Sequence, residues 1–487
     1  MLLHNLISRV AGQSGELSGE KIALILRGVI LIVLFTIIFV VAYRRYFWHS
    51  KESRNLFYWS TGLLFLVVVS KYAIFHFFKG YIPDHLFFYA LPSPKVKSFG
   101  WFILPCIIFI IFLKYRQKIL NLPTKKFLLA LWATFVSFAV SVATTREGIY
   151  SIYERFSRVY WEYTGNLPLV KTIGSFLHDY TMLNSQLIGH TTTHPPGYTI
   201  ILYSLQQLFQ VKFLGLAILV VMLGGLAIIP VYYFLKQWAS EEEARKSLQF
   251  FIFLPSFVLL GATSMDVTLV LSAWLALATL FIGWKKSAWL ALVGGVCAGF
   301  ALFSNFLFLL FAPVLLYFAY QARRQVNETQ GALVRIFVSL VGFIGFFIFL
   351  YLTTGYSIIE NFYVAQIANH YAVASNFVSV RMYMVYLLAS LTDFIIYSGI
   401  PVWLIIIKNG WSNNHTIVKV GFATVVLFLL VGVFQGETGR LWLFLLPLFV
   451  LFNSRKNDSG ETGQEINLLS LLFFNTIILQ TLFYTYW

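Results

Sequence analysis

Long apolar runs recur along the chain from residue 22 to the C-terminus, and they restrict its fold more than any other feature. Each run is about 15 to 23 residues long, which suits an α-helix that crosses a hydrocarbon core of about 30 Å. The strands of a membrane β-barrel would instead give alternating segments of about ten residues. With 59% hydrophobic and 11% charged residues, the sequence predicts an all-α polytopic membrane protein.

We expect about fourteen transmembrane helices, because this number of apolar runs can be separated along the chain. The candidate spans are 22–43, 56–77, 99–114, 127–145, 213–235, 247–261, 265–283, 288–303, 305–321, 334–353, 383–407, 417–435, 441–453 and 467–487.

The formal net charge of +16 does not indicate a nucleic-acid partner, because the basic residues form short clusters between the apolar runs. The positive-inside rule predicts that such clusters lie on the cytoplasmic side. The clusters are Arg44, Arg45, Lys51 and Arg54; Lys114, Arg116, Lys118, Lys125 and Lys126; Lys236, Arg245 and Lys246; Lys285 and Lys286; Arg323, Arg324 and Arg335; Lys408 and Lys419; and Arg455 and Lys456.

The apolar segment 198–209 follows a double proline and, at roughly 12 residues, is too short to span a bilayer. We expect a juxtamembrane or re-entrant helix at the outer interface. A full crossing here would move the basic clusters between residues 236 and 286 to the outer side, against the positive-inside rule. Pro195 and Pro196 fix φ and push His194 out of the α region, which gives a stiff entry to this helix.

This threading places the loops 146–196, 261–266, 354–382 and 436–440 on the outer face, and acidic and histidine residues gather there. They are Glu147, Glu154, Glu162, Asp179, Asp266, Glu360, Glu437, His178, His190, His194 and His370. The loop 78–98 contains Lys79, Lys95 and Lys97 and fits the charge rule poorly.

Two features of the loop 146–196 favour chemistry at the membrane surface. Its glutamates alternate with tyrosine, tryptophan and arginine, a composition typical of membrane interfaces and suited to stacking on sugar rings. His190 and His194 lie just before the double proline and can donate to phosphate oxygens when protonated. The alternatives are a solvated amphipathic helix and structural histidines.

The sequence indicates no certain cofactor. A divalent metal stays open as an alternative, with His190, His194 and either Asp179 or a nearby Glu as ligands, although no HExxH or paired-cysteine pattern is present. Cys106 and Cys297 lie inside apolar runs. Asp393 lies inside a predicted span, where a charge requires a partner or a function.

The stretch "HTTTHPPG" at 190–197, behind an acid-bearing loop, and "GETGRLWLFLLP" at 436–447 resemble segments of the GT-C superfamily of membrane glycosyltransferases. This superfamily includes protein O-mannosyltransferases and aminoarabinose transferases. The resemblance covers roughly residues 127 to 450. It implies a catalytic core at 127–453, an N-terminal three-helix extension at 1–126 and a C-terminal helix at 454–487.

The resemblance implies a polyprenyl-phosphate sugar donor, a hydroxyl acceptor on a lipid, glycan or protein, and an acidic base in the first large outer loop. Glu162 is the first candidate for that base, followed by Glu154 and Glu147. Many relatives carry an Asp-Glu pair that this loop lacks. His194 matches the position beside the lipid phosphate, and Arg440 suits a second, bidentate phosphate contact. The other candidate substrate-binding residues are His190, Glu437, Asp266, Asp179, Tyr163 and His370.

The expected location is a bacterial inner membrane, with the site on the periplasmic face. A lipid-linked sugar flippase or other transporter, and an O-antigen polymerase or ligase, are the alternatives. Transporters often show inverted repeats and broken helices near the bilayer midplane. Here the polar groups gather at one face, which favours an interfacial enzyme.

Overall fold

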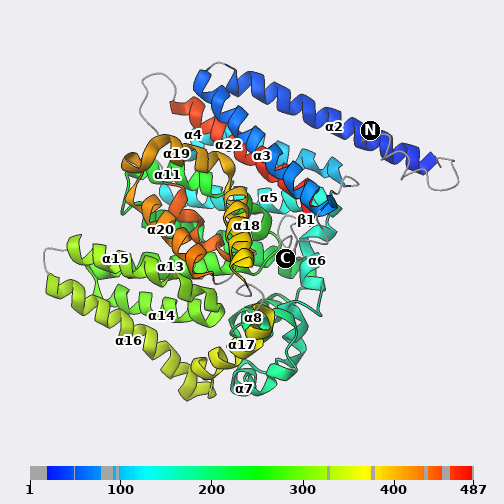
Figure 1. Ribbon diagram of the computed structural model, residues 1–487. Coiled ribbons are helices and arrows are strands. Elements are labelled where there is room, and N and C mark those ends of the chain that lie inside the picture. Colours follow the sequence, from blue (N-terminus) through cyan, green and yellow to red (C-terminus); the bar gives the residue numbers. More distant parts are fainter. Residues whose placement is uncertain are drawn as a thin grey trace.

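The computed structural model describes residues 19–48, 50–77, 91–94, 98–325, 329–373, 379–432, 437–451 and 461–484. Its regular structure is helical apart from a two-residue antiparallel pair, β1 (Leu91–Pro92) with β2 (Phe483–Tyr484). The all-α polytopic prediction is confirmed (Figure 1). The elements up to the HPPG motif are α2 (Gly19–Ala42), η1 (Tyr43–Phe47), α3 (Lys51–Phe77), η3 (Phe99–Phe102), α4 (Ile103–Leu120), α5 (Thr124–Glu147), α6 (Tyr150–Ser157), η4 (Tyr163–Leu169), α7 (Ile173–Asp179), η5 (Met182–Ser185) and η6 (Gly189–Thr193).

The remaining helices begin at the motif itself. They are α8 (Gly197–Phe209), α9 (Phe213–Gly225), α10 (Ile228–Leu235), α11 (Glu241–Phe251), α12 (Pro255–Gly261), α13 (Asp266–Lys286), α14 (Ala288–Ser304), η7 (Phe306–Phe311), α15 (Ala312–Gln325), α16 (Thr329–Thr354), α17 (Ile358–Val373), α18 (Val380–Ser398), α19 (Ile400–Asn413), α20 (Thr416–Val431), α21 (Thr438–Leu441), η9 (Leu443–Phe449) and α22 (Glu461–Leu482).

Eight helical segments of the described chain are long and apolar enough to cross a membrane. They are Lys51–Ile74, Thr124–Glu147, Phe213–Leu235, Asp266–Lys286, Phe306–Gln325, Gln330–Thr354, Val380–Ser398 and Gly463–Leu482. Three apolar helices are shorter, namely Ala288–Ser304, Ile400–Gly410 and Thr416–Val431.

Three segments predicted as single spans, 247–261, 383–407 and 441–453, are interrupted in the structure. Pro255 begins α12 and cannot donate a backbone hydrogen bond, so α11 does not continue through it. Gly399 separates α18 from α19 at φ 102, a conformation that glycine tolerates. The last segment forms mainly the 3₁₀ helix η9. The prediction of about fourteen crossings therefore counts segments that are not continuous α-helices.

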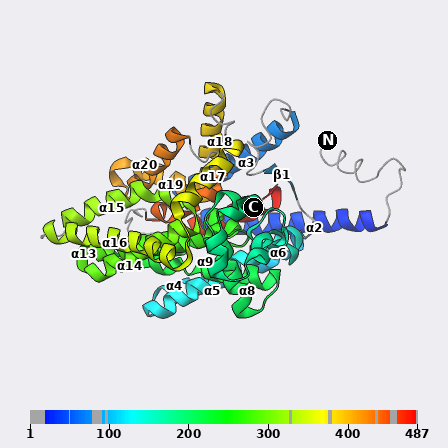
Figure 2. The ribbon, with the colours of Figure 1, turned by 90° about the horizontal axis from the view of Figure 1, so that it is seen from below.

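The helix after the double proline has the predicted length. α8 contains 13 residues, which extend about 20 Å at 1.5 Å per residue and so fall short of a bilayer core of about 30 Å. Pro196 is its N-cap residue, and His194 has an extended backbone with φ −123 and ψ 161. In Figure 2 α8 lies beside α9, against which it packs.

The loops predicted to share the outer face meet at one end of the bundle. Arg440 pairs with Asp266, and the Nδ1 atom of His178 lies 3.2 Å from the carbonyl oxygen of Thr354. At the other end, basic residues join the opposite loops: Lys246 lies 3.2 Å from Glu465. Figure 1 draws α6, α7 and α8 at the lower right, and α11 and α19 at the upper left.

The N-terminal helices are tied to the rest of the bundle by a buried ion pair. Lys71 Nζ of α3 lies 2.8 Å from Asp393 Oδ1 of α18, and the Asp393 side chain is almost fully buried. Asp393 therefore has the partner that a charge inside a span requires. The lysines predicted to fit the charge rule poorly, Lys79, Lys95 and Lys97, lie outside the described residues.

Candidate active site

The loop 146–196 folds into short helices, and one buried side chain joins two of them, η4 and η6. The Nδ2 atom of Asn166 in η4 donates to the carbonyl oxygen of Ile188 at 3.1 Å and to Thr191 Oγ1 at 2.7 Å. Its Oδ1 atom accepts from the Ile188 N–H at 2.8 Å. Because Asn166 is fully buried, these bonds fix η4 against η6, and with it the position of the preceding residue, Glu162.

Glu162 forms a buried ion pair with Arg155 of α6. The Arg155 Nε atom lies 2.5 Å from Glu162 Oε1, and Glu162 is only 6% exposed. Burial raises the pKa of the Glu162 carboxyl above its ordinary value. The cations Arg155 and Arg440 oppose this shift, while the carboxylate of Asp266 reinforces it. Glu162 is thus a more basic carboxylate than one in water.

Arg440 of α21 lies between two carboxylates. Its Nε atom is 3.2 Å from Asp266 Oδ2, and its Nη2 atom is 2.5 Å from Glu437 Oε2. Asp266 begins α13, where the helix dipole favours a negative charge, and its Oδ2 atom accepts from Ser264 Oγ at 2.7 Å. Thr438 Oγ1 donates to the carbonyl oxygen of Ser390 in α18 at 2.6 Å, which anchors α21.

The two histidines of the motif lie against this cluster as neutral rings. Arg155 Nη2 is 3.4 Å from His190 Nε2, so that nitrogen accepts and is unprotonated. His194 Nδ1 lies 2.8 Å from the carbonyl oxygen of His190 and therefore donates to it. Burial lowers the pKa of both histidines, and Arg440 lowers them further, whereas Asp266 raises that of His194.

Tyr163 lies among the rings of the motif. Its ring centroid is 6.3 Å from that of His190, 6.0 Å from that of His194 and 5.2 Å from that of Tyr198. The glycine of HPPG allows α8 to pack closely against α14, because a Cβ atom on Gly197 would lie 2.5 Å from a backbone oxygen of α14. Another residue there would push α8 away from α14.

The structure therefore brings together Glu162, Asp266, Glu437, Arg440, His190, His194 and Tyr163, which we call the outer-end cluster. Glu154 is adjacent: it pairs with Arg158, whose charge acts on the pKa of Glu162.

Two predicted site residues take part in none of these ion pairs. Glu147 ends α5 and Asp179 ends α7, both half-buried. His370 lies in α17, but its side chain is outside the described part. Across the described ranges no three His, Cys, Asp or Glu side chains converge so as to hold a metal ion.

Arg155, Arg158 and Tyr198 were not predicted from the sequence. Glu154 and Arg158 are four residues apart in the sequence, and this spacing could have revealed the pair, although Arg158 is the C-cap residue that follows α6. Nothing local could have revealed the pairing of Arg155 with Glu162, because α6 ends at Ser157 and the chain turns between them.

Residues 193–352 match the family model described as dolichyl-phosphate-mannose-protein mannosyltransferase. This match supports membership of the GT-C superfamily. It also supports a membrane glycosyltransferase of the GT-C type. The matched residues include His194 and Asp266 of the outer-end cluster, whereas Glu162 and Arg440 lie outside them. No curated protein matches the chain significantly, and no solved structure does.

Proposed function

We propose that this GT-C-type protein transfers a sugar from a polyprenyl-phosphate donor to a hydroxyl group on a lipid, glycan or protein acceptor. The core that performs the reaction is residues 127–453, with 1–126 and 454–487 as additions. One observation carries the proposal: Glu162 is a buried carboxylate 2.5 Å from Arg155, and it lies within electrostatic reach of Arg440. In this proposal Glu162 is the base and Arg440 is the phosphate-binding cation of one site.

Glu162 acts as the general base in this proposal. Its carboxylate takes the proton of the acceptor hydroxyl while the hydroxyl oxygen forms a bond to the anomeric carbon. The bond between that carbon and the donor phosphate oxygen breaks, and the electron pair leaves with the polyprenyl phosphate. A single displacement of this kind inverts the anomeric centre. Tyr160 and Trp161, which are 63% and 59% exposed, precede Glu162 and give an aromatic surface for an acceptor sugar.

Arg440 balances the charge of the departing phosphate. Of its two carboxylate partners Glu437 has the more exposed side chain, at 18% against 11% for Asp266, so a donor phosphate displaces Glu437 more readily. Asp266 then keeps the guanidinium oriented for a bidentate contact with the phosphate.

His194 contributes through its second nitrogen. The Nδ1–H group of His194 donates a hydrogen bond to the carbonyl oxygen of His190. The other ring nitrogen of a neutral His194, Nε2, is therefore only an acceptor. A phosphate anion at this position favours the imidazolium and offsets the effect of burial on the pKa. His194 therefore takes up a proton when the sugar donor binds, and its Nε2–H group then donates a hydrogen bond to the donor phosphate.

The site faces the exterior in this proposal, on the periplasmic side of a bacterial inner membrane, because Lys246 and Lys408, which belong to two of the basic clusters, lie at the opposite end of the bundle. A cysteine in place of exposed Ser175 in α7 reports the side. Ser175→Cys reacts with an impermeant maleimide added from outside; reaction only after the cytoplasmic side is opened would place the site on the wrong face.

The decisive experiment uses the purified full-length protein in lipid nanodiscs with a panel of radiolabelled polyprenyl-phosphate sugars. We expect one donor to support transfer by the parent protein and by Glu147→Gln, whereas Glu162→Gln binds that donor without transferring the sugar. If Glu162→Gln, Glu154→Gln and Glu147→Gln all transfer at the parent rate, the base is not a loop glutamate. Movement of the donor across the bilayer without transfer would instead indicate a flippase.

A further inference from the structure

A cavity with charged and apolar walls lies at the end of the bundle opposite to the outer-end cluster. Its volume is 460 Å³, and α3, α11, α19 and α22 contribute its walls. Figure 1 draws these four helices in the upper part of the molecule, away from α7 and α8. The described residues that line it include no member of the outer-end cluster, so a ligand here is distinct from the proposed donor.

Two ion pairs give the cavity charges of both signs. Lys408 Nζ of α19 lies 3.1 Å from Glu52 Oε2 of α3, and Lys246 Nζ of α11 lies 3.2 Å from Glu465 Oε1 of α22. Glu243 adds a third carboxylate to the lining. A purely anionic ligand would face these carboxylates, and a purely cationic one would face the lysines. A zwitterion can place each of its charges beside the opposite charge.

Glu52 and Lys408 can exchange partners at low cost. Their side chains are about half exposed, at 49% and 54%, and ion pairs of this kind contribute little to stability. An incoming ammonium can therefore pair with Glu52 while an incoming phosphate pairs with Lys408.

A buried acceptor in the lining lacks a partner. Asn467 is 2% exposed, and its Nδ2 atom donates to Ser53 Oγ at 2.6 Å. Its Oδ1 atom is buried and accepts no hydrogen bond within the described part of the chain. Since buried polar atoms are nearly always paired, a rotation of the Asn467 side chain toward the cavity would let this oxygen accept from a ligand, and an ammonium group is a strong donor.

The remaining lining is apolar and adjoins the lipid. Leu56, Leu404 and Ile405 line the cavity together with Trp59, which is 65% exposed. An exposed tryptophan at the end of a membrane helix is typical of the lipid interface. A ligand with a polar head and an apolar tail fits such a lining better than a wholly soluble one.

We propose that this cavity binds a primary ammonium–phosphate zwitterion, supplied as the head group of an aminophospholipid. The ammonium group lies beside Glu52 and Asn467 Oδ1, the phosphate lies beside Lys408, and the acyl chains run past Trp59 into the bilayer. Free glycerophosphoethanolamine shares the polar chemistry but has no tail.

Native mass spectrometry of the full-length protein, delipidated in detergent, tests this proposal independently of any transferase activity. Phosphatidylethanolamine, phosphatidylcholine and phosphatidylglycerol with identical acyl chains are each added back. We expect about tenfold stronger retention of phosphatidylethanolamine than of either other lipid, because only its head group combines a hydrogen-bonding ammonium with a phosphate. Lys408→Gln and Asn467→Leu should each reduce this retention about tenfold.

Lys125→Gln is the matched control, since Lys125 is an exposed lysine at the start of α5 that does not line the cavity. It should retain the lipid as the parent does. Three results would each overturn the proposal. The protein could retain phosphatidylglycerol as strongly as phosphatidylethanolamine, Lys125→Gln and Lys408→Gln could lose the lipid equally, or spermidine could bind in place of the lipid. Binding of glycerophosphoethanolamine as tightly as the lipid would support the zwitterion site but assign it to a soluble ligand.

Discussion

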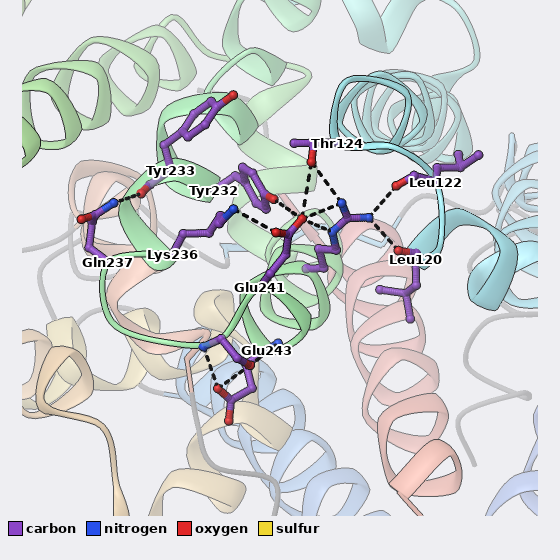
Figure 3. Close-up of polar contacts among 11 residues, drawn as sticks. Leu120, Leu122, Thr124, Tyr232, Tyr233, Lys236, Gln237, Glu241 and Glu243 are labelled. Atoms are coloured by element: carbon purple, nitrogen blue, oxygen red, sulfur yellow. Dashed lines mark hydrogen bonds and ion pairs between the residues drawn. The ribbon is translucent and has the colours of Figure 1, made fainter.

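Two glutamates at opposite ends of the bundle show how the surroundings of a carboxylate decide its use. Glu241 begins α11, and Figure 3 shows it surrounded by Thr124, Tyr232 and Lys236. Tyr232 donates to it at 3.0 Å and Lys236 at 2.9 Å. Glu162, by contrast, is buried in the outer-end cluster and pairs with Arg155.

The pKa values of these two carboxyls move in opposite directions. Hydrogen bonds from Lys236, Arg245 and Tyr232 lower the pKa of Glu241 to about 2, and its side chain is 45% exposed. Burial outweighs the nearby arginines at Glu162 and raises its pKa. A weakly basic, exposed carboxylate joins helices together, whereas a buried and more basic one can accept a proton from a substrate.

The largest effect should separate the two glutamates directly. Removal of a general base costs about 10² to 10⁴ in rate, so Glu162→Gln should lose transfer by that factor and keep its donor affinity. Glu241→Gln should transfer within a few-fold of the parent. Single-turnover rates with a radiolabelled donor measure both variants. If Glu162→Gln and Glu241→Gln lost transfer rate equally, the two glutamates would not differ in their role in the reaction.

Arg440→Lys should show a smaller effect, on donor binding. Lysine keeps the charge but loses the planar fork, and a lost charge-assisted hydrogen bond weakens binding by about 10- to 100-fold. Equilibrium binding of a polyprenyl-phosphate sugar measures it. Arg245→Lys, which changes an arginine at the Glu241 end, is the control and should bind as the parent does. Parent-like affinity in Arg440→Lys would exclude a bidentate phosphate contact.

His194→Ala should weaken donor binding by about tenfold, because one charge-assisted hydrogen bond is lost. The pH dependence sharpens this test. The parent should bind the donor with proton uptake, since the free histidine is neutral and the bound one is charged, so its affinity should fall as pH rises. The variant should show a weaker dependence. The same slope in both proteins would mean that the proton goes elsewhere.

The helical class and the grouping of the outer loops were predictable because apolar run length and the placement of lysine and arginine reflect the membrane directly. Interruptions within apolar segments were harder to predict. Pro255 and Gly399 lie in hydrophobic sequence that continues on both sides, and composition alone does not show that the helix ends there.

Part of the outer-end cluster could also be predicted, since the HPPG motif identified His194 and its neighbours. The acidic partner that the loop lacked comes from a different part of the chain. Asp266 lies about 100 residues after Glu162 in the sequence, yet its charge acts on the same carboxyl. Such an assembly depends on tertiary packing of α13 and α21, which no local pattern encodes.

In the proposed mechanism burial and Asp266 turn Glu162 into the base, and the pH dependence of the transfer rate tests this role most directly. A base works when deprotonated, so the rate should rise with pH through a midpoint above 4.5, the ordinary pKa of a glutamate. Asp266→Asn removes a negative charge that raises this pKa, so its midpoint should lie at lower pH. A midpoint that stays unchanged in Asp266→Asn, or lies at 4.5 or below in the parent, would contradict the account.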